Sequence, residues 1–177
     1  RVMAIINLTD DSFSSDGLRG DLARALARAE RALEEGAEML DIGAESTRPG
    51  SDPVPEAQEL ERVVRFVEAA RGWKVPLSID TLKPTVMRAA LAAGADMIND
   101  INAFRASGAI EAVAAGESGL CVMHMLGQPR TMQQDPRYAD VVGEVTGFLD
   151  ERVAALVAAG VARERIVLDP GFGFGKS

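Results

Sequence analysis

Acidic, amide and histidine side chains recur along the chain at one kind of position, directly after a short apolar run. Six such runs end in a polar residue, and a loop containing Gly, Pro or Ser follows each: Asn7, Asp41, Asp80, Asn99, His124 and Asp169. The carboxyl ends of buried parallel strands are where α/β proteins gather their chemistry. Carboxylates and an amide at a shared rim can accept hydrogen bonds from the N–H edge of a heterocycle. They can also ligate Mg²⁺ through oxygen atoms. Asp80, Asn99 and Asp169 are therefore expected to form a site for one of these two.

The segment from Asp169 to Ser177, DPGFGFGKS, is the most distinctive stretch. Its glycines at 171, 173 and 175 remove side chains from a loop at a strand end, so the backbone can approach a flat ligand. It does not match a phosphate-binding P-loop, whose first glycine would fall at Pro170. It does not match a dinucleotide fingerprint either, because its third glycine comes one residue early. Phe174 and Lys176 add an aromatic ring and a cation, which favours a binding loop.

Two other segments carry groups suited to binding. Arg48 lies in the short loop ESTRPG (45–50), pinned by Pro-Gly, and an arginine held in this way can grip a phosphate or carboxylate through two hydrogen bonds. The loop after Asn7 extends to about Gly20, and long loops in barrels are often lids. The single histidine, His124, has no second zinc ligand beside it and is interpreted as a hydrogen-bonded packing residue.

The segments between the apolar runs have helical spacing, at about 21–35, 55–71, 84–93, 109–115 and 139–159, with Asp21 as the cap of the first. Continuous apolar strands that alternate with helices indicate a parallel sheet covered by helices. Right-handed crossovers would curl this sheet into an arc of a parallel barrel. The fold class is therefore α/β, a (β/α)8 TIM barrel of which the chain carries about the first six strands and five helices; the alternative is an open six-stranded sheet. One domain is expected over 1–177, truncated at both ends.

Amino-acid composition and net charge argue against some classes of protein. Hydrophobic residues make up 47% and charged residues 26% of the 177 positions, as in ordinary globular proteins. The net charge of −8 argues against a nucleic-acid surface. No apolar run approaches the length of a membrane span, and no signal-peptide pattern is present. The one cysteine, Cys121, is interpreted as a small core residue and fits a reducing cytoplasm.

The motifs together resemble the dihydropteroate synthases, which are pterin-binding barrels. The resemblance covers essentially the whole chain in the right order, through INLT (6–9), DSFS (11–14), ESTRPG (45–50), SIDT (78–81), IND (98–100), MHM (123–125) with Gly127 and Pro129, and DPGFGFGK (169–176). It implies an enzyme of folate biosynthesis, a transferase and sulfonamide target. Such an enzyme joins 6-hydroxymethyl-7,8-dihydropterin diphosphate to p-aminobenzoate and releases diphosphate. It also implies Mg²⁺ as cofactor, and it allows a homodimer.

By motif match, the resemblance assigns residues to each part of the site. Arg48, Asp80 and Asp169 are the implied catalytic residues. The implied pterin contacts are Asp80, Asn99, Met123, Asp169 and Phe174. The implied p-aminobenzoate contacts are Phe13, Thr47 and Phe174. The implied diphosphate contacts are Asn7 and Arg48, and Asn7 is also the implied metal ligand.

The sequence departs from the family in two places. The first loop has Asp10, Ser15 and Asp16 where the family usually has proline and then Asp-Gly. The family's later Ser-Arg-Lys and Arg-x-His segments do not occur, so the 177-residue form alone is expected to be inactive. The alternative functions are a pterin-binding methyltetrahydrofolate methyltransferase and a non-catalytic pterin-binding fragment.

Overall fold

The structure is a computed structural model that describes residues 1–8, 17–45, 53–127 and 136–176, with 17–21 as backbone only. Its elements alternate along the chain. They are β1 (Met3–Asn7), α1 (Gly17–Glu34), β2 (Met39–Gly43), α2 (Glu56–Ala70), β3 (Leu77–Asp80), α3 (Pro84–Ala93), β4 (Met97–Asp100), α4 (Ala109–Val113), β5 (Gly119–Met123), α5 (Val141–Ala158), a 3-10 turn (Arg163–Arg165) and β6 (Ile166–Asp169).

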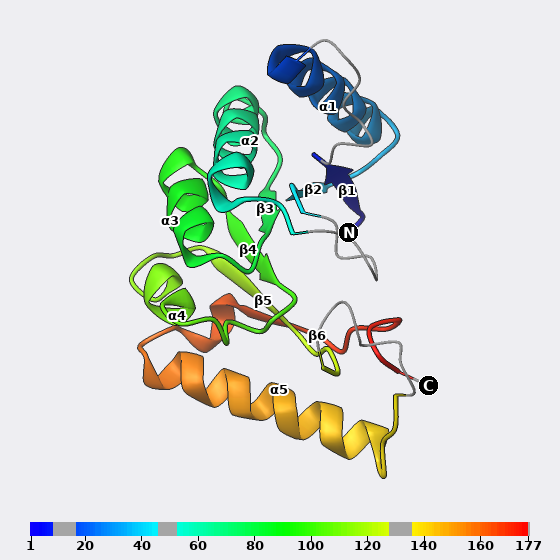
Figure 1. Cartoon of the computed structure of the whole chain (residues 1–177), viewed down its shortest axis with the longest axis vertical. Helices are drawn as coiled ribbons and strands as arrows, with labels where there is room; N and C mark the ends of the chain where they lie inside the picture. Colours follow the sequence, from blue (N-terminus) through cyan, green and yellow to red (C-terminus); the bar gives the residue numbers. More distant parts are fainter. Residues whose placement is uncertain (9–16, 46–52, 128–135, 177) are drawn as a thin grey trace.

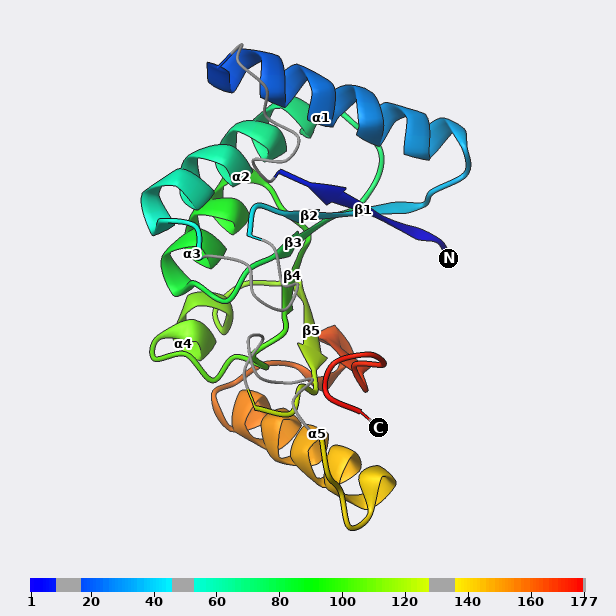
Figure 2. The same cartoon turned by 45° about the vertical axis from the view of Figure 1, so that its right-hand side comes forward.

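The strands form one parallel sheet in the order β1-β2-β3-β4-β5-β6. Each strand pairs with the next in sequence, whereas a doubly wound open sheet reverses its strand order part-way. The sheet curves into an arc, with the five α-helices along its outer side and the concave side facing away from them (Figures 1 and 2). This is the arrangement of part of an α/β barrel, as the sequence predicted.

Local signals explain most of the helix boundaries. Pro84 opens α3, and Gly94 ends it with a left-handed φ of 115°. Asp140 caps α5 by accepting a hydrogen bond from the backbone N–H of Gly143 at 3.1 Å. The expected cap of the first helix is wrong, because α1 begins at Gly17 and Asp21 lies inside it.

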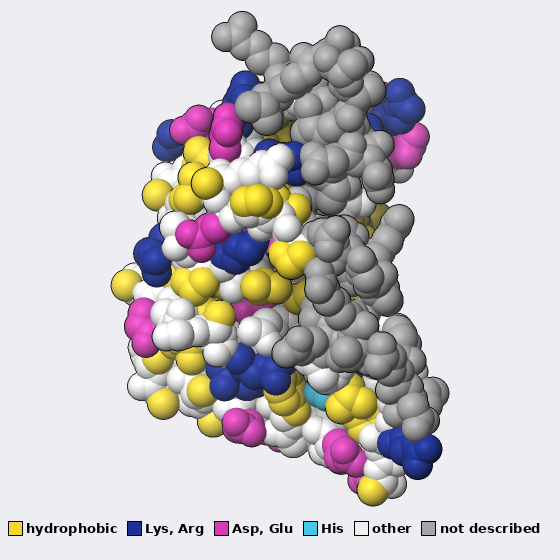
Figure 3. Space-filling view, in the orientation of Figure 1, with side chains coloured by type: hydrophobic (Ala, Val, Ile, Leu, Met, Phe, Trp, Pro, Cys, Tyr) yellow, Lys and Arg dark blue, Asp and Glu magenta, His cyan; other side chains and the backbone are white. Residues whose placement is uncertain are grey.

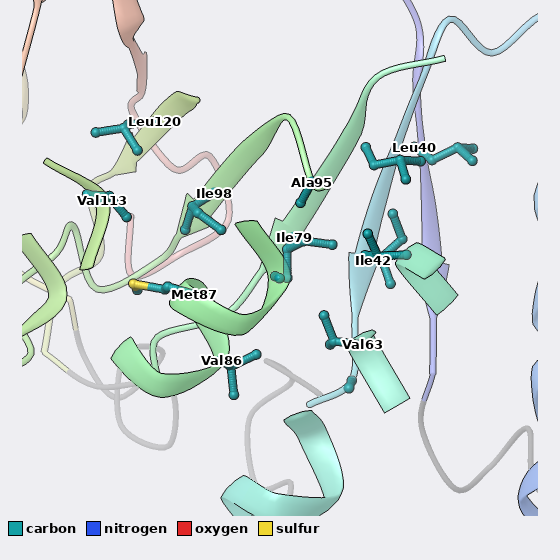
Figure 4. Close-up of a cluster of buried hydrophobic side chains, with 14 of the residues drawn as sticks. Leu40, Ile42, Val63, Ile79, Val86, Met87, Ala95, Ile98, Val113 and Leu120 are labelled. Atoms are coloured by element: carbon teal, nitrogen blue, oxygen red, sulfur yellow. The ribbon is translucent and has the colours of Figure 1, made fainter. Parts of the chain in front are cut away.

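The core lies between the outer face of the sheet and the helices. Alternate strand residues point outward, and Figure 4 shows Leu40, Ile42, Ile79, Ile98 and Leu120 meeting helix residues that include Val63, Val86, Met87 and Val113. All nine are at most 1% exposed. Burying each such side chain stabilises the fold by about 1.5–3 kcal/mol. Because the pleat has a period of two, this face also determines which residues lie on the opposite, concave face.

Charges of both signs lie on the face drawn in Figure 3. Figure 3 shows Lys and Arg side chains interspersed with Asp and Glu on the face that it draws. Among the described residues, no helix is both long and apolar enough to cross a membrane.

Candidate active site

Strand register brings three of the predicted site residues into one row on the concave face. Asn7 is aligned with Gly43, Gly43 with Asp80, and Asp80 with Asn99. Each lies one residue beyond an outward-pointing apolar side chain, so all of them point to the concave side. Asp80 and Asn99, two of the three strand-end residues predicted to share a site, are therefore neighbours in this row, and Asn7 lies at its other end.

Asp41 belongs to the same face, although the motifs did not single it out as a site residue. Its Oδ2 accepts a hydrogen bond from the Asn99 side-chain amide at 3.2 Å. Its Oδ1 is buried without a hydrogen-bond partner in the described part of the chain. Burial raises the pKa of Asp41, and the nearby Ser78 and Asn99 side chains oppose the rise. A buried carboxylate oxygen without a donor is costly, so this group is suited to accept a hydrogen bond from a ligand.

A usable signal for Asp41 was present in the sequence. It ends an apolar run, and it lies two residues before Gly43, which places both on the same face of the strand. The family motifs drew attention to the loop that begins at Glu45 instead.

Asp80 lies near four other acidic side chains. Burial raises the pKa of its carboxyl well above the usual range, and the charges of Asp41, Asp100, Glu59 and Glu45 raise it further. A β-carbon on Gly43 would lie 3.5 Å from Asp80 Oδ2, so the glycine leaves this flank of the carboxylate open. The ionised carboxylate is disfavoured in this setting, and a ligand N–H or positive charge would relieve the repulsion.

Asp100, the neighbour of Asn99, points the other way. Its carboxylate accepts hydrogen bonds from the backbone N–H groups of Asn102 and Phe104, both at 2.7 Å. These bonds hold a turn in which Ala103 and Phe104 have left-handed φ values of 54° and 56°. Asp100 is therefore a turn-forming residue on the outer face, and Asn99 alone of the pair faces the site.

The glycine-rich segment begins at Asp169, which lies farther along its strand than the row. β5 separates β6 from Asn99, and Met123 is aligned with Asp169. Asp169 Oδ1 accepts a hydrogen bond from the Gly171 backbone N–H at 2.7 Å. Gly171 has φ +68°, and a β-carbon there would lie 2.1 Å from the His124 carbonyl oxygen. Only glycine fits at this position, because both the conformation and the space exclude a side chain.

Lys176 fastens this segment to the end of β5. Its Nζ lies 2.7 Å from His124 Nδ1, and it donates to the carbonyl oxygens of His124 at 2.9 Å and Phe174 at 3.2 Å. Burial and the Lys176 charge lower the pKa of His124, which fits a neutral imidazole that accepts at Nδ1. His124 also packs edge-on against Phe148, with ring centroids 5.0 Å apart. His124 is thus the packing residue that the sequence predicted, and Lys176 ties down the loop.

Met123 and Phe174 meet in a small apolar cluster. Phe174 packs against a buried group made by Ile101, Met123 and Met125. The predicted pair of pterin-packing side chains is therefore brought together, beside the carboxylate of Asp169.

The remaining predictions concern the p-aminobenzoate contacts, the diphosphate contacts and the metal. Phe13, Thr47 and Arg48 lie outside the described residues. The alternative of a metal site built from the strand-end carboxylates stays a prediction; the described part of the chain has no group of three or more His, Cys, Asp or Glu residues that could hold an ion. Asn7 is an exposed amide at the end of β1, with its backbone carbonyl held by Arg28 at 2.5 Å.

The same motifs and topology occur in known proteins. The sequence model of a family described as "Pterin binding enzyme" matches residues 3–177. The chain belongs to this family.

Its relatives include a dihydropteroate synthase from Neisseria meningitidis serogroup B, 50% identical over 99% of the chain and 62% of the relative. A crystal structure of Burkholderia cenocepacia dihydropteroate synthase complexed with 7,8-dihydropteroate is 60% identical. It has a TM-score of 0.88, over 99% of this chain and 60% of that one. A Yersinia pestis dihydropteroate synthase with a sulfonamide drug complex is 47% identical, with a TM-score of 0.93 over 100% and 65%.

These likenesses establish the architecture. The chain's five β/α units and sixth strand are part of a TIM barrel, and the chain spans about three fifths of the relatives' length.

Proposed function

We propose that the protein is a dihydropteroate synthase, which condenses 6-hydroxymethyl-7,8-dihydropterin diphosphate with p-aminobenzoate to give 7,8-dihydropteroate and diphosphate. The observation that carries this proposal is the concave-face row of Asp80 and Asn99, joined by Asp41, in a chain 60% identical to a protein that binds 7,8-dihydropteroate.

The proposed pterin contacts are Asp80, Asn99, Met123, Asp169 and Phe174. The carboxylates and the amide oxygen can accept from the N–H edge of the ring, and crowding of negative charge around Asp80 strengthens that preference. Met123 and Phe174 supply an apolar surface for the flat ring. Asp41 is added to this set because its Oδ2 accepts from Asn99 and its Oδ1 has no hydrogen-bond partner among the described residues.

Breaking the carbon–oxygen bond to diphosphate places negative charge on the leaving group and positive charge on the pterin methylene. We assign Arg48 to the leaving diphosphate, where a bidentate arginine stabilises developing charge. Asp80 and Asp169 are the proposed catalytic carboxylates that favour the positive charge on the ring side. The amine of p-aminobenzoate is already a nucleophile, so Phe13, Thr47 and Phe174 need mainly to position it.

Mg²⁺ is the proposed cofactor, with Asn7 as its protein ligand and a further contact of the diphosphate. Mg²⁺ usually keeps several waters and takes one or two protein oxygens together with substrate phosphates. An exposed amide at the strand end, in the row with Asp80, fits that requirement. When bound, the ion would offset the negative charge of the diphosphate. A cytoplasmic location and a homodimer are the remaining proposals.

The deciding experiment measures diphosphate release from the pterin diphosphate with p-aminobenzoate, with and without a sulfonamide. Sulfonamide-sensitive release is expected from the protein that contains this chain. Methyl transfer from methyltetrahydrofolate in place of this reaction would identify a methyltransferase. Pterin binding without turnover would identify a non-catalytic protein.

Arg48→Ala tests the diphosphate assignment. Loss of a charge-assisted hydrogen bond of about 1.5–3 kcal/mol should weaken binding of the diphosphate-bearing pterin about ten- to a hundred-fold. Free pterin should bind as before. Arg31→Ala, an exposed arginine on α1, is the matched control. Equal losses for both ligands in calorimetry would show that Arg48 does not contact the diphosphate.

A further inference from the structure

A half-buried lysine joins three parts of the chain beside the candidate site. Lys83 lies at the start of α3, and its side chain is 16% exposed. Its Nζ is 2.5 Å from Glu45 Oε2, 2.5 Å from Glu59 Oε2 and 2.7 Å from the Val54 carbonyl oxygen. An ammonium group has three N–H donors, and here each has an acceptor. Lys83 is thereby committed to protein contacts and is not itself suited to bind a ligand.

One of the acceptors, Glu59, is held in place by a further hydrogen bond. Glu59 is 1% exposed on α2, and its second oxygen, Oε1, accepts from the Thr81 hydroxyl at 2.5 Å. That hydroxyl in turn accepts from the Lys83 backbone N–H at 3.2 Å. Burial lowers the pKa of Lys83, but the hydrogen bonds and charges of Glu45 and Glu59 outweigh it, so the pKa is raised and the charge is retained.

Two of the three acceptors of Lys83 flank the segment that carries Arg48, so this network can do more than stabilise the fold. Glu45 lies directly before segment 46–52, which carries Thr47 and Arg48, and Val54 lies two residues after its end. Lys83 thus fastens both flanks of that segment to the residues that follow Asp80 on β3. A buried ion pair contributes little net stability over an apolar replacement, so stability alone is a weak reason for it.

We propose that Lys83, with Glu45 and Glu59, is a positioning residue that holds the Arg48-bearing segment in register with Asp80. This rests on the proposed function, in which Arg48 contacts the diphosphate and Asp80 the pterin. Displacement of a binding group by about 1 Å can cost about a hundred-fold, so the fastening should set affinity for the diphosphate part of the substrate.

The test compares Lys83→Met with Lys74→Met, which makes the same change at an exposed lysine. If Lys83→Met fails to fold because Glu59 is left unpaired, the double variant with Glu59→Gln removes the buried charge on both sides. Two readouts are needed. Hydrogen exchange in the peptide spanning 44–56 reports the fastening, with α5 as the internal reference. Calorimetry reports the ratio of affinities for pterin diphosphate and free pterin.

We expect Lys83→Met, or the double variant, to speed exchange in 44–56 and to lower the affinity ratio about tenfold or more, with Lys74→Met unchanged. Unchanged hydrogen exchange in 44–56 would show that Lys83 does not hold this segment. Faster exchange with an unchanged ratio of affinities would show that holding the segment does not affect binding of the diphosphate. If the unsubstituted protein binds no pterin diphosphate, the proposed function fails, and exchange still decides whether Lys83 holds the segment.

Discussion

The two faces of the sheet are built from the same strands but hold opposite kinds of side chain. On the helix-covered face, Leu40, Ile79 and Ile98 are fully buried among apolar partners. On the concave face, Asp41 has an unpartnered buried oxygen and Asp80 a strongly raised pKa. The first face stabilises the fold, whereas the second holds groups whose charged forms are disfavoured until a ligand supplies donors. Stability and binding should therefore respond to different residues of one strand.

Leu40→Ala should produce the largest change in stability. Removing a fully buried leucine side chain leaves a cavity and should lower the free energy of unfolding by about 2–5 kcal/mol, measured by denaturant titration. The folded fraction should bind pterin as before, because Leu40 faces away from the site. A weakened affinity per folded molecule would contradict the separation of the two faces.

Asp100 is an acidic side chain on the otherwise apolar outer face, and its contribution to stability should depend on pH. Burial raises its pKa to about 6, against an ordinary 3.8, so the folded state binds the proton more tightly than the unfolded state does. Its stabilising contribution is full below pH 3.8 and is lost as pH rises through about 6. The loss should be on the order of 3 kcal/mol, taking about 1.4 kcal/mol per pKa unit.

The measurement is the free energy of unfolding against pH for the unsubstituted protein and Asp100→Asn. Asp41 and Asp80 titrate in the same direction in both proteins, so the difference between the two curves reports Asp100 together with the effect of its charge on Asp80. Parallel curves between pH 4 and pH 7 would show that Asp100 does not titrate as described.

Asp41→Asn and Asp80→Asn should weaken ligand binding and leave stability largely unchanged, the opposite of what is expected for Leu40→Ala. Each amide keeps the volume of the carboxylate but cannot accept at both positions, so pterin affinity should fall about ten- to a hundred-fold. The thermal midpoint without ligand should hold or rise, because a disfavoured buried charge is removed. A large drop in that midpoint, or unchanged affinity in calorimetry, would show that these carboxylates support the fold rather than the ligand.

The reactivity of Cys121 tests the environment of the concave face without any substitution. Burial raises the pKa of its thiol to about 12, and the charges of Asp169, Asp41 and Asp80 add to the rise. Alkylation by iodoacetamide at pH 8 should therefore be about a hundred-fold or more slower than for an ordinary thiol, because the thiolate is the reactive form. The denatured protein is the control. Equal rates in both states would contradict the burial of this thiol among the carboxylates of the concave face.

The sequence by itself determined the strand–helix alternation, the six strand ends and the glycine requirement of the last loop. These are local properties, since apolar runs, helix caps and positive φ values follow from neighbouring residues. It also pointed to Asp80, Asn99, Met123, Asp169 and Phe174, which the structure arranges along one face and one strand end. The assigned roles of these residues, and the single domain over 1–177, stay predictions.

Only the tertiary structure decided which of two adjacent polar residues faces the ligand. Asn99 and Asp100 look alike as strand-end groups, yet the first bonds to Asp41 and the second holds a turn on the far side. Likewise, the sequence offered no sign that Lys83 would meet Glu45 and Glu59, which lie 38 and 24 positions away. The reason is physical: strand pairing and helix packing join residues that are distant in the chain, and local patterns carry no information about which distant partners the register will bring together.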